Sequence, residues 1–310
     1  MYYTRVVIKT KIEKMNWRNF LLTITLVTLT QGVFAQYNLL NATAPEEIGV
    51  KTEAQKEYDN AKPLEYGFID DKDVLWSKMV WEKIVLDERI NFPLYYPVDT
   101  MNIGKERRSL YDVLLKNIKN GKIENLYTDS YFTGKQTFDQ VVEGLVKIDT
   151  LDLGYEQYNA GEPISPEYID TTQIKAYDVK EYRTKGLWYF DKRQGELKYR
   201  LIALCPVVPD VFFLDSDEPD LIEPFWIFFP DVRDILNEAM CFNNKNTAMP
   251  ISFDHMLNAR RFNANMYKEE NVYEDRQIDD YIPNNALMQL LESDRIRTKI
   301  RDFELDQWQY

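Results

Sequence analysis

A short stretch in the second half of the chain constrains the fold most strongly. Residues 186–206 read GLWYFDKRQGELKYRLIALCP. After Gly195, apolar residues alternate with charged ones at a period of two, which is typical of a half-buried β-strand. The aromatic run 188–190 supplies a partner strand, and 191–195 supplies the turn between them. The stretch therefore predicts a β-hairpin.

Six charged residues crowd this hairpin: Asp191, Lys192, Arg193, Glu196, Lys198 and Arg200. They form either an active site or the polar face of a sheet. Mixed charges that alternate with apolar residues line one face of a strand, and such a face is usually exposed or interfacial. No nucleophile or poised base stands among them. We interpret the hairpin as architecture.

The remaining periodicity predicts an α+β fold. Capping residues and helical spacing predict helices over 73–85, 109–119, 137–147, 230–242, 252–267 and 285–302. Short strands are expected at 90–97 and before Pro230. Because strands and helices come in blocks rather than in strict alternation, we expect antiparallel, hairpin-containing sheets packed with helices.

Composition shifts along the chain suggest its division into segments. We expect a signal peptide at 1–35, an extended arm at 36–65, a first α+β subdomain at 66–150, a connecting segment at 151–182, a second α+β subdomain at 183–283 and a C-terminal helix at 284–310. A faint echo between 93–112 and 224–254 raises the alternative that the two subdomains are related.

The N-terminus resembles an export signal. Five basic residues precede the apolar run 20–29, which is too short for the roughly twenty residues of a membrane-spanning helix. Small residues follow, so cleavage is expected between Ala35 and Gln36, and Met15 is an alternative start. A lipoprotein would carry Cys in place of Gln36. We therefore expect a soluble exported protein that reaches a membrane only through a partner.

The charge narrows the class of partner. The formal net charge is −13, and cleavage after residue 35 would remove five positive charges and one negative charge, leaving −17. This balance argues against nucleic acid, whose phosphates require clustered Lys and Arg. The two cysteines, Cys205 and Cys241, have two open readings: a structural disulfide permitted by an oxidising compartment, or two small buried apolar residues.

The sequence offers little catalytic chemistry, and it predicts no cofactor or metal site. It contains neither the G-x-G nor the P-loop pattern for phosphates, and no G-x-S-x-G motif. The single histidine, His255, reads as a helix-start residue. The acidic run 215–220 lacks the glycine of a calcium loop and reads as a solvated turn. Carboxylates paired in space, as in glycosidases, stay open as an alternative.

Three long segments resemble one family. They are residues 74–97, the hairpin from Gly186, and residues 224–282, which include PFWIFFPDVRDILNEAMCFN and ISFDHMLNARRFNANMYKEENVYEDRQIDDYI. These segments are similar to the GldN/PorN proteins of gliding motility and type IX secretion in Bacteroidota. The resemblance spans residues 66–283. It implies a non-enzymatic periplasmic subunit that forms a ring with an outer-membrane lipoprotein of the GldK/PorK kind. The ring would meet the periplasmic domain of a GldM/PorM-like motor.

A closed ring requires head-to-tail contacts between copies. Aromatic residues are enriched at such contacts, so Trp188 and Trp226 are candidate interface residues, with a core position as the alternative for each. Two other classes stay open at this point: an exported glycan hydrolase that uses paired carboxylates, and a periplasmic protein that binds a small ligand.

Overall fold

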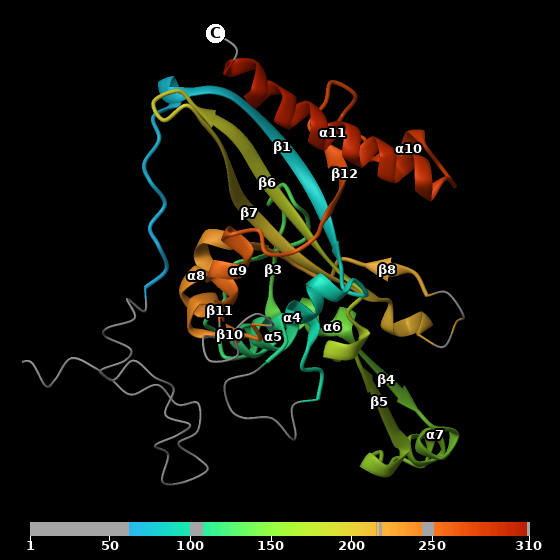
Figure 1. Ribbon diagram of the computed structural model, residues 1–310. Coiled ribbons are helices and arrows are strands. Elements are labelled where there is room, and N and C mark those ends of the chain that lie inside the picture. Colours follow the sequence, from blue (N-terminus) through green and yellow to red (C-terminus); the bar gives the residue numbers. More distant parts are fainter. Residues whose placement is uncertain (1–61, 100–107, 215, 217–218, 244–250, 309–310) are drawn as a thin grey trace, which may run out of the picture. The chain divides into compact units, whose positions relative to one another are not determined.

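The computed structural model describes residues 62–99, 108–214, 216, 219–243 and 251–308. Within these residues one antiparallel sheet runs in the order β12-β1-β6-β7-β9-β2-β3, and β8 pairs with β7 (Figure 1). Its strands are β1 (Val74–Val85), β2 (Leu126–Tyr127), β3 (Lys135–Gln136), β6 (Glu181–Asp191), β7 (Glu196–Pro209), β8 (Leu221–Ile222), β9 (Trp226–Phe228) and β12 (Asn265–Glu269). The fold is α+β, as predicted.

Two smaller pairs of strands accompany this sheet. They are β4 (Val146–Thr150) with β5 (Ile169–Gln173), and β10 (Met240–Cys241) with β11 (Ile251–Ser252). The α-helices are α4 (Phe92–Tyr95), α5 (Leu110–Lys119), α6 (Phe138–Leu145), α7 (Asp152–Asn159), α8 (Phe229–Glu238), α9 (Phe253–Asn258), α10 (Ile278–Tyr281) and α11 (Ala286–Gln307). The short 3-10 helices are η3 (Asp71–Asp73), η4 (Arg89–Asn91), η5 (Pro166–Tyr168), η6 (Ala176–Asp178) and η7 (Val211–Phe213).

The predicted hairpin forms and is longer than expected. β6 and β7 pair from Asp191 opposite Glu196 to Glu181 opposite Val207. The register shifts between Lys185 and Gly186, where the ring of Tyr199 lies against the glycine. A side chain at position 186 would overlap that ring, so only glycine fits there.

The helix predicted over 73–85 is wrong, because this segment is the strand β1. β1 lies between β12 and β6 in the sheet. Val80, Trp81 and Glu82 are consecutive and all buried, so both faces of the strand are covered. A strand buried on both faces loses the alternation of apolar and polar residues, and its spacing then resembles that of a helix.

The strand predicted at 90–97 is also wrong. Residues 89–95 form η4 and then α4, with Pro93 in the first turn of the helix, where its missing N–H costs nothing. The buried Asn91 side chain fixes this turn: it donates to the carbonyls of Val85 and Asn263 and accepts from the Asn263 amide. This tertiary contact overrides the apolar pattern of the segment.

The helix starts predicted at 109, 137 and 285 are confirmed, and a side chain caps each of them. Ser109 accepts from the Asp112 amide at the start of α5, and Thr137 forms a capping box with Gln140 at the start of α6. Asn285 caps α11, which continues beyond its predicted end to Gln307. The helix capped by Ser252 ends early, at Asn258, and the chain then turns into β12.

The predicted subdomains 66–150 and 183–283 do not divide the sheet. β1 comes from the first range and pairs with β6 and β12 from the second, and residues 61–310 form one compact unit. The expected connecting segment 151–182 contains α7 and β5. Within the described ranges, no helix combines the length and apolar character needed to cross a membrane.

The predicted signal peptide 1–35, its cleavage site at Ala35 and Gln36, and the arm as far as residue 61 lie outside the described residues.

Candidate functional site

The charged tip of the hairpin is held together by a buried carboxylate. Asp191 is only 1% exposed, so it does not belong to an exposed face, as the alternation had suggested. Its Oδ1 accepts from the backbone amides of Arg193 and Gln194, at 2.9 and 3.4 Å. Gly195 closes the turn with a positive φ of 66°. Asp191 therefore caps the turn.

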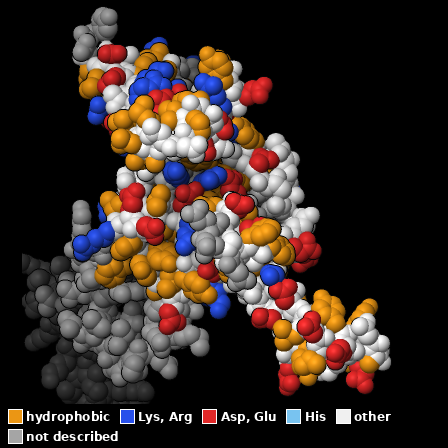
Figure 2. All heavy atoms as spheres, turned by 90° about the vertical axis from the view of Figure 1, so that its right-hand side faces the viewer, with side chains coloured by type: hydrophobic (Ala, Val, Ile, Leu, Met, Phe, Trp, Pro, Cys, Tyr) orange, Lys and Arg blue, Asp and Glu red, His pale blue; other side chains and the backbone are white. Residues whose placement is uncertain are grey.

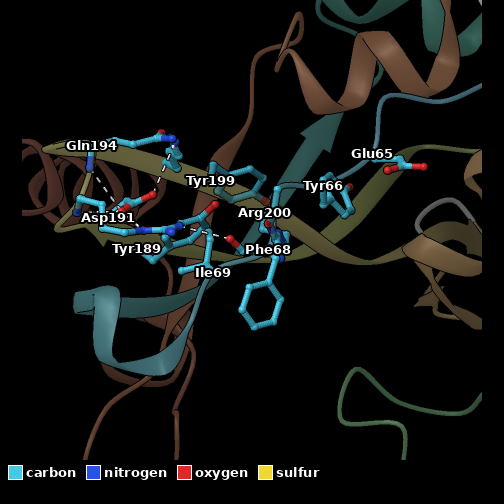
Figure 3. Close-up of a pocket in the computed structure, with 12 residues that line it drawn as sticks. Glu65, Tyr66, Phe68, Ile69, Tyr189, Asp191, Gln194, Tyr199 and Arg200 are labelled. Carbon is cyan, nitrogen blue, oxygen red and sulfur yellow. Dashed lines mark hydrogen bonds and ion pairs between the residues drawn. The ribbon is translucent and has the colours of Figure 1, made fainter.

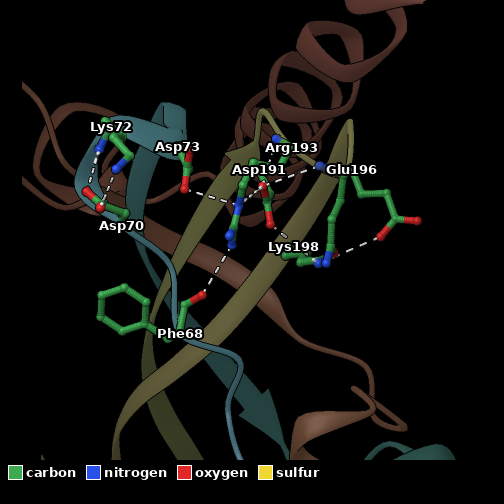
Figure 4. Close-up of polar contacts among 9 residues, drawn as sticks. Phe68, Asp70, Lys72, Asp73, Asp191, Arg193, Glu196 and Lys198 are labelled. Carbon is green, nitrogen blue, oxygen red and sulfur yellow. Dashed lines mark hydrogen bonds and ion pairs between the residues drawn. The ribbon is translucent and has the colours of Figure 1, made fainter.

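Ion pairs join this turn to the chain that leads into β1 (Figure 4). Arg193 Nε lies 3.1 Å from Asp73 Oδ2 and 3.9 Å from Asp191 Oδ1. Lys198 Nζ lies 3.8 Å from both Asp191 Oδ2 and Glu196 Oε2. The charges of the hairpin thus pair with one another and with Asp73.

The segment before β1 lies along the outer side of the hairpin. We call residues 62–70 the strap. Among the described residues, no backbone hydrogen bond joins it to the sheet. Three guanidinium groups bind its carbonyl oxygens instead: Arg193 donates to Phe68 and Arg200 to Gly67, both at 3.2 Å, and Arg233 of α8 donates to Leu64 at 2.5 Å.

Tyr66 anchors the strap. Its ring centroid lies 4.0 Å from the guanidinium carbon of Arg233 and 4.7 Å from that of Arg200, which is the geometry of cation–π contacts. Its hydroxyl donates to Asn258 Oδ1 at 2.8 Å. Burial raises the pKa of Tyr66 above its ordinary value, so the hydroxyl remains a donor at neutral pH.

A buried ion pair holds the groups that contact Tyr66 in place. Arg233 donates to both carboxylate oxygens of Asp254, at 2.9 and 3.2 Å, and Asp254 is 4% exposed. Asn258 donates to the same carboxylate at 2.8 Å. Asp254 therefore fixes two of the three groups that contact Tyr66, the Arg233 guanidinium and the Asn258 amide.

A cavity of about 180 Å³ lies between the strap and the hairpin (Figure 3). This volume is below the roughly 300 Å³ at which small-molecule pockets begin. The lining residues are Glu65 to Ile69 of the strap, with Tyr189, Asp191, Arg193, Gln194, Lys198, Tyr199 and Arg200. The site offers hydrogen-bond donors to a peptide backbone and a slot for one aromatic ring, so it suits an extended chain.

A second buried ion pair lies further along β1. Arg260 binds both carboxylate oxygens of the fully buried Glu82 at 2.8 Å. The Arg260 guanidinium stacks on Tyr199, and it also lies 5.2 Å from the ring of Trp188. Trp188 is half-buried and packs within the chain.

The other candidate interface residue, Trp226, is 1% exposed and belongs to the core. Its Nε1 donates to Glu223 Oε2 at 2.6 Å. A side chain with no accessible surface in the folded subunit cannot contact a partner directly, so the core alternative describes Trp226.

Both cysteines are free, buried thiols, and the disulfide reading is corrected. Cys205 packs with Trp81 and Trp226, whereas Cys241 belongs to the main core and contacts the Met256 sulfur at 3.6 Å. Burial raises the pKa of both thiols, that of Cys241 to about 11.

His255 is exposed in the first turn of α9, where its amide donates to Ser252 Oγ. Within the part of the chain that the structure describes, no group of three or more His, Cys, Asp or Glu side chains is placed to hold a metal ion.

Sequence reasoning did not find the strap site. Tyr66 and Asn258 are separated by 192 positions, and Leu64 and Arg233 by 169. No local pattern marks such a contact. The one local signal was the aromatic Tyr66, directly after the arm predicted over 36–65.

Comparison with known proteins identifies a family. The family model described as gliding motility associated protein GldN matches residues 69–309. No curated protein matches the chain.

Proposed function

Because the chain belongs to the GldN family, and is thereby a component of the gliding-motility and type IX secretion machinery, we propose that it is a non-enzymatic subunit of a periplasmic ring. In this proposal it assembles with an outer-membrane lipoprotein of the GldK/PorK kind and with further copies of itself. The ring connects to a GldM/PorM-like motor protein, and the lipoprotein holds the chain at the inner side of the outer membrane.

The observation that carries this proposal is an apolar surface on a small ribbon, the segment 146–173 that contains β4, α7 and β5. Gly154 is the only buried residue of α7. Large apolar side chains of the ribbon are exposed instead: Ile148 (66%), Leu151 (52%), Leu153 (55%), Tyr155 (56%) and Tyr158 (68%). A two-stranded ribbon with so little core is marginally stable alone. Contact with a partner protein would cover this surface.

The charges of the ribbon favour a partner with basic groups. Six acidic residues and one Lys lie between 146 and 173. Figure 2 shows hydrophobic and acidic side chains gathered over this ribbon, at the lower right. Apolar contacts at the centre and ion pairs at the rim are the usual anatomy of a protein–protein interface.

The buried carboxylates support a structural role rather than a hydrolase. Glu82 pairs with Arg260, Asp254 with Arg233, and Glu181 with Arg183. A glycosidase needs two carboxylates that flank its substrate, and none of these three lines the cavity beside the strap.

The test is co-purification of a C-terminally tagged chain from gently solubilised envelopes. The double variant Leu153→Ser/Tyr158→Ser should lose the lipoprotein or the motor protein while the subunit stays folded. Val272→Ser, which changes a side chain that is 90% exposed outside the ribbon, is the matched control and should retain both. Equal recovery of all partners with the double variant would remove the ribbon from the proposal.

A further inference from the structure

The groove that holds the strap has the properties of a peptide-binding site. We define it by the side chains of Arg193, Arg200, Arg233 and Asn258, which together contact Leu64, Tyr66, Gly67 and Phe68. Three of these four contacts reach backbone carbonyls, so they require an extended chain but no particular side chain. The contact at Asn258, with the two arginines around it, selects one aromatic ring.

The groove selects a backbone and a ring rather than a charge. Three of its cations are already paired within the subunit: Arg193 with Asp73, Arg233 with Asp254, and Lys198 with Asp191 and Glu196. Residues 62–69 themselves carry one Lys and one Glu. The occupant is therefore an extended segment with one aromatic anchor.

The strap can leave its groove without disturbing the sheet. None of its contacts belongs to the hydrogen-bond ladder of the described strands. A pivot near Asp70, at the start of η3, would release residues 62–69 while β1 stays paired. At most about 3.5 Å per residue, these eight residues reach about 28 Å from the pivot.

Two side chains of the strap are poorly covered when it lies in its own groove. Leu64 is 79% exposed and Phe68 is 84% exposed, although the backbone atoms of both are bound. A segment that is fixed at its backbone and presents large apolar side chains to solvent has a surface to offer to a neighbour.

We propose that the groove is a binding site for an extended, tyrosine-anchored segment, and that residues 62–69 of a second copy fill it in the assembled protein. The exchanged strap makes the same contacts between copies that it makes within one copy. This is a domain swap, which needs no contacts beyond those already present in the single subunit. This inference rests on the proposed assembly function and names a contact between neighbouring copies.

The first experiment measures binding of a strap peptide. A fluorescent peptide of residues 61–71 (AKPLEYGFIDD) is titrated against the full chain carrying Tyr66→Ala, whose own strap lacks its anchor. It should bind that variant at least about tenfold more tightly than it binds the unaltered chain, because an attached strap competes at high effective concentration. A peptide with Ala in place of Tyr66 is the control. Equal binding of the two peptides would overturn the site.

The second experiment asks whether the strap crosses between copies. The Tyr66→Ala chain keeps an intact groove, and an Arg200→Ala chain keeps an intact strap. Arg200 contacts the strap and the ring of Tyr189 and is not part of the Asp254 pair, so the fold should persist. Native mass spectrometry of the mixture should show paired species that contain one copy of each variant, at a level that neither variant reaches alone.

The outcomes separate this inference from the proposed function. Peptide binding without mixed pairs would overturn the exchange and leave a strap that serves only its own subunit. Rings that form from the Tyr66→Ala chain as well as from the unaltered chain would also overturn the exchange, while they would support the ring. Failure of the unaltered chain to recover any ring partner would instead contradict the proposed function.

Discussion

Arg260 donates two hydrogen bonds of 2.8 Å to the carboxylate of Glu82, which lies in the second half of β1 and has no exposed surface. Tyr199 completes the group: its hydroxyl lies 3.3 Å from Glu82 Oε2, and its ring covers the guanidinium at 4.1 Å. Three segments far apart in the sequence are joined at this point, so the ion pair positions the loop after α9 on the sheet.

Removing Arg260 should destabilise the fold strongly. Arg260→Ala leaves the Glu82 carboxylate buried without a partner, which costs about 3–5 kcal/mol in comparable cases. Urea unfolding followed by tryptophan fluorescence measures the loss. The double variant Glu82→Leu/Arg260→Met removes both charges and should recover most of the free energy of unfolding. If the single and double variants were equally unstable, the charge pairing would not be the cause.

The thiols should be free but protected. We expect two reactive thiols per chain in denaturant without any reductant, and almost none in the folded protein at pH 8. Burial raises the pKa of Cys241 to about 11 and that of Cys205 as well, so neither is a thiolate under these conditions. A colorimetric thiol assay gives the count. No thiols before reduction would show that the chain carries a disulfide after all.

Two glycines should respond in opposite directions to alanine. Gly186→Ala would drive a methyl group into the ring of Tyr199 and should cost about 1–3 kcal/mol, because that ring is fixed by Glu82 and Arg260. Gly144 lies in α6, and nothing lies within 4 Å of the place that a Cβ would take, so Gly144→Ala should gain about 0.5–1 kcal/mol of helix stability. Thermal unfolding of both variants is the measurement, and similar shifts for the two would contradict this packing.

Lys185 should make stability depend on pH. It is 8% exposed, it faces the rings of Trp81 and Tyr131, and burial together with the charge of Lys268 lowers its pKa. In the window between this lowered pKa and the ordinary value of 10.5, the unfolded chain binds more protons. Stability contributed at this position therefore rises with pH in that window.

The variant Lys185→Met isolates this effect. The difference in unfolding free energy between the unaltered chain and the variant should shift in favour of the unaltered chain from pH 7 to pH 10. Buried thiols and tyrosines are common to both proteins, so their titration cancels in the difference. A difference in unfolding free energy that stays constant with pH would contradict the lowered pKa of Lys185.

The sequence was informative where structure depends on neighbours along the chain. Ser109, Thr137 and Asn285 cap helices through the amide three residues ahead, and the hairpin turn at Gly195 needs only five residues. These signals are local, so they predicted the α+β class and most helix starts correctly.

The failures arose where distant contacts decide the structure. β1 pairs with β6 and β12 at its two edges, and distant residues such as Ile296 and Trp226 pack with Val80 and Trp81 on its two faces. Residues 90–97 turn into a helix around the contacts of Asn91 with Asn263. The strap site is assembled in the same way, because Arg233 of α8 and Asn258 of α9 lie beside Tyr66 only in the folded chain. Residue spacing carries no trace of such contacts.

Electron microscopy tests most directly whether the chain is a ring subunit. The complex is purified through a C-terminal tag from gently solubilised envelopes, and its chains are identified by mass spectrometry. A ring subunit should give ring-shaped particles that contain this chain and a GldK-like lipoprotein in near-equal amounts. A lone monomer whose recovery does not depend on detergent would show that the chain is not a ring subunit.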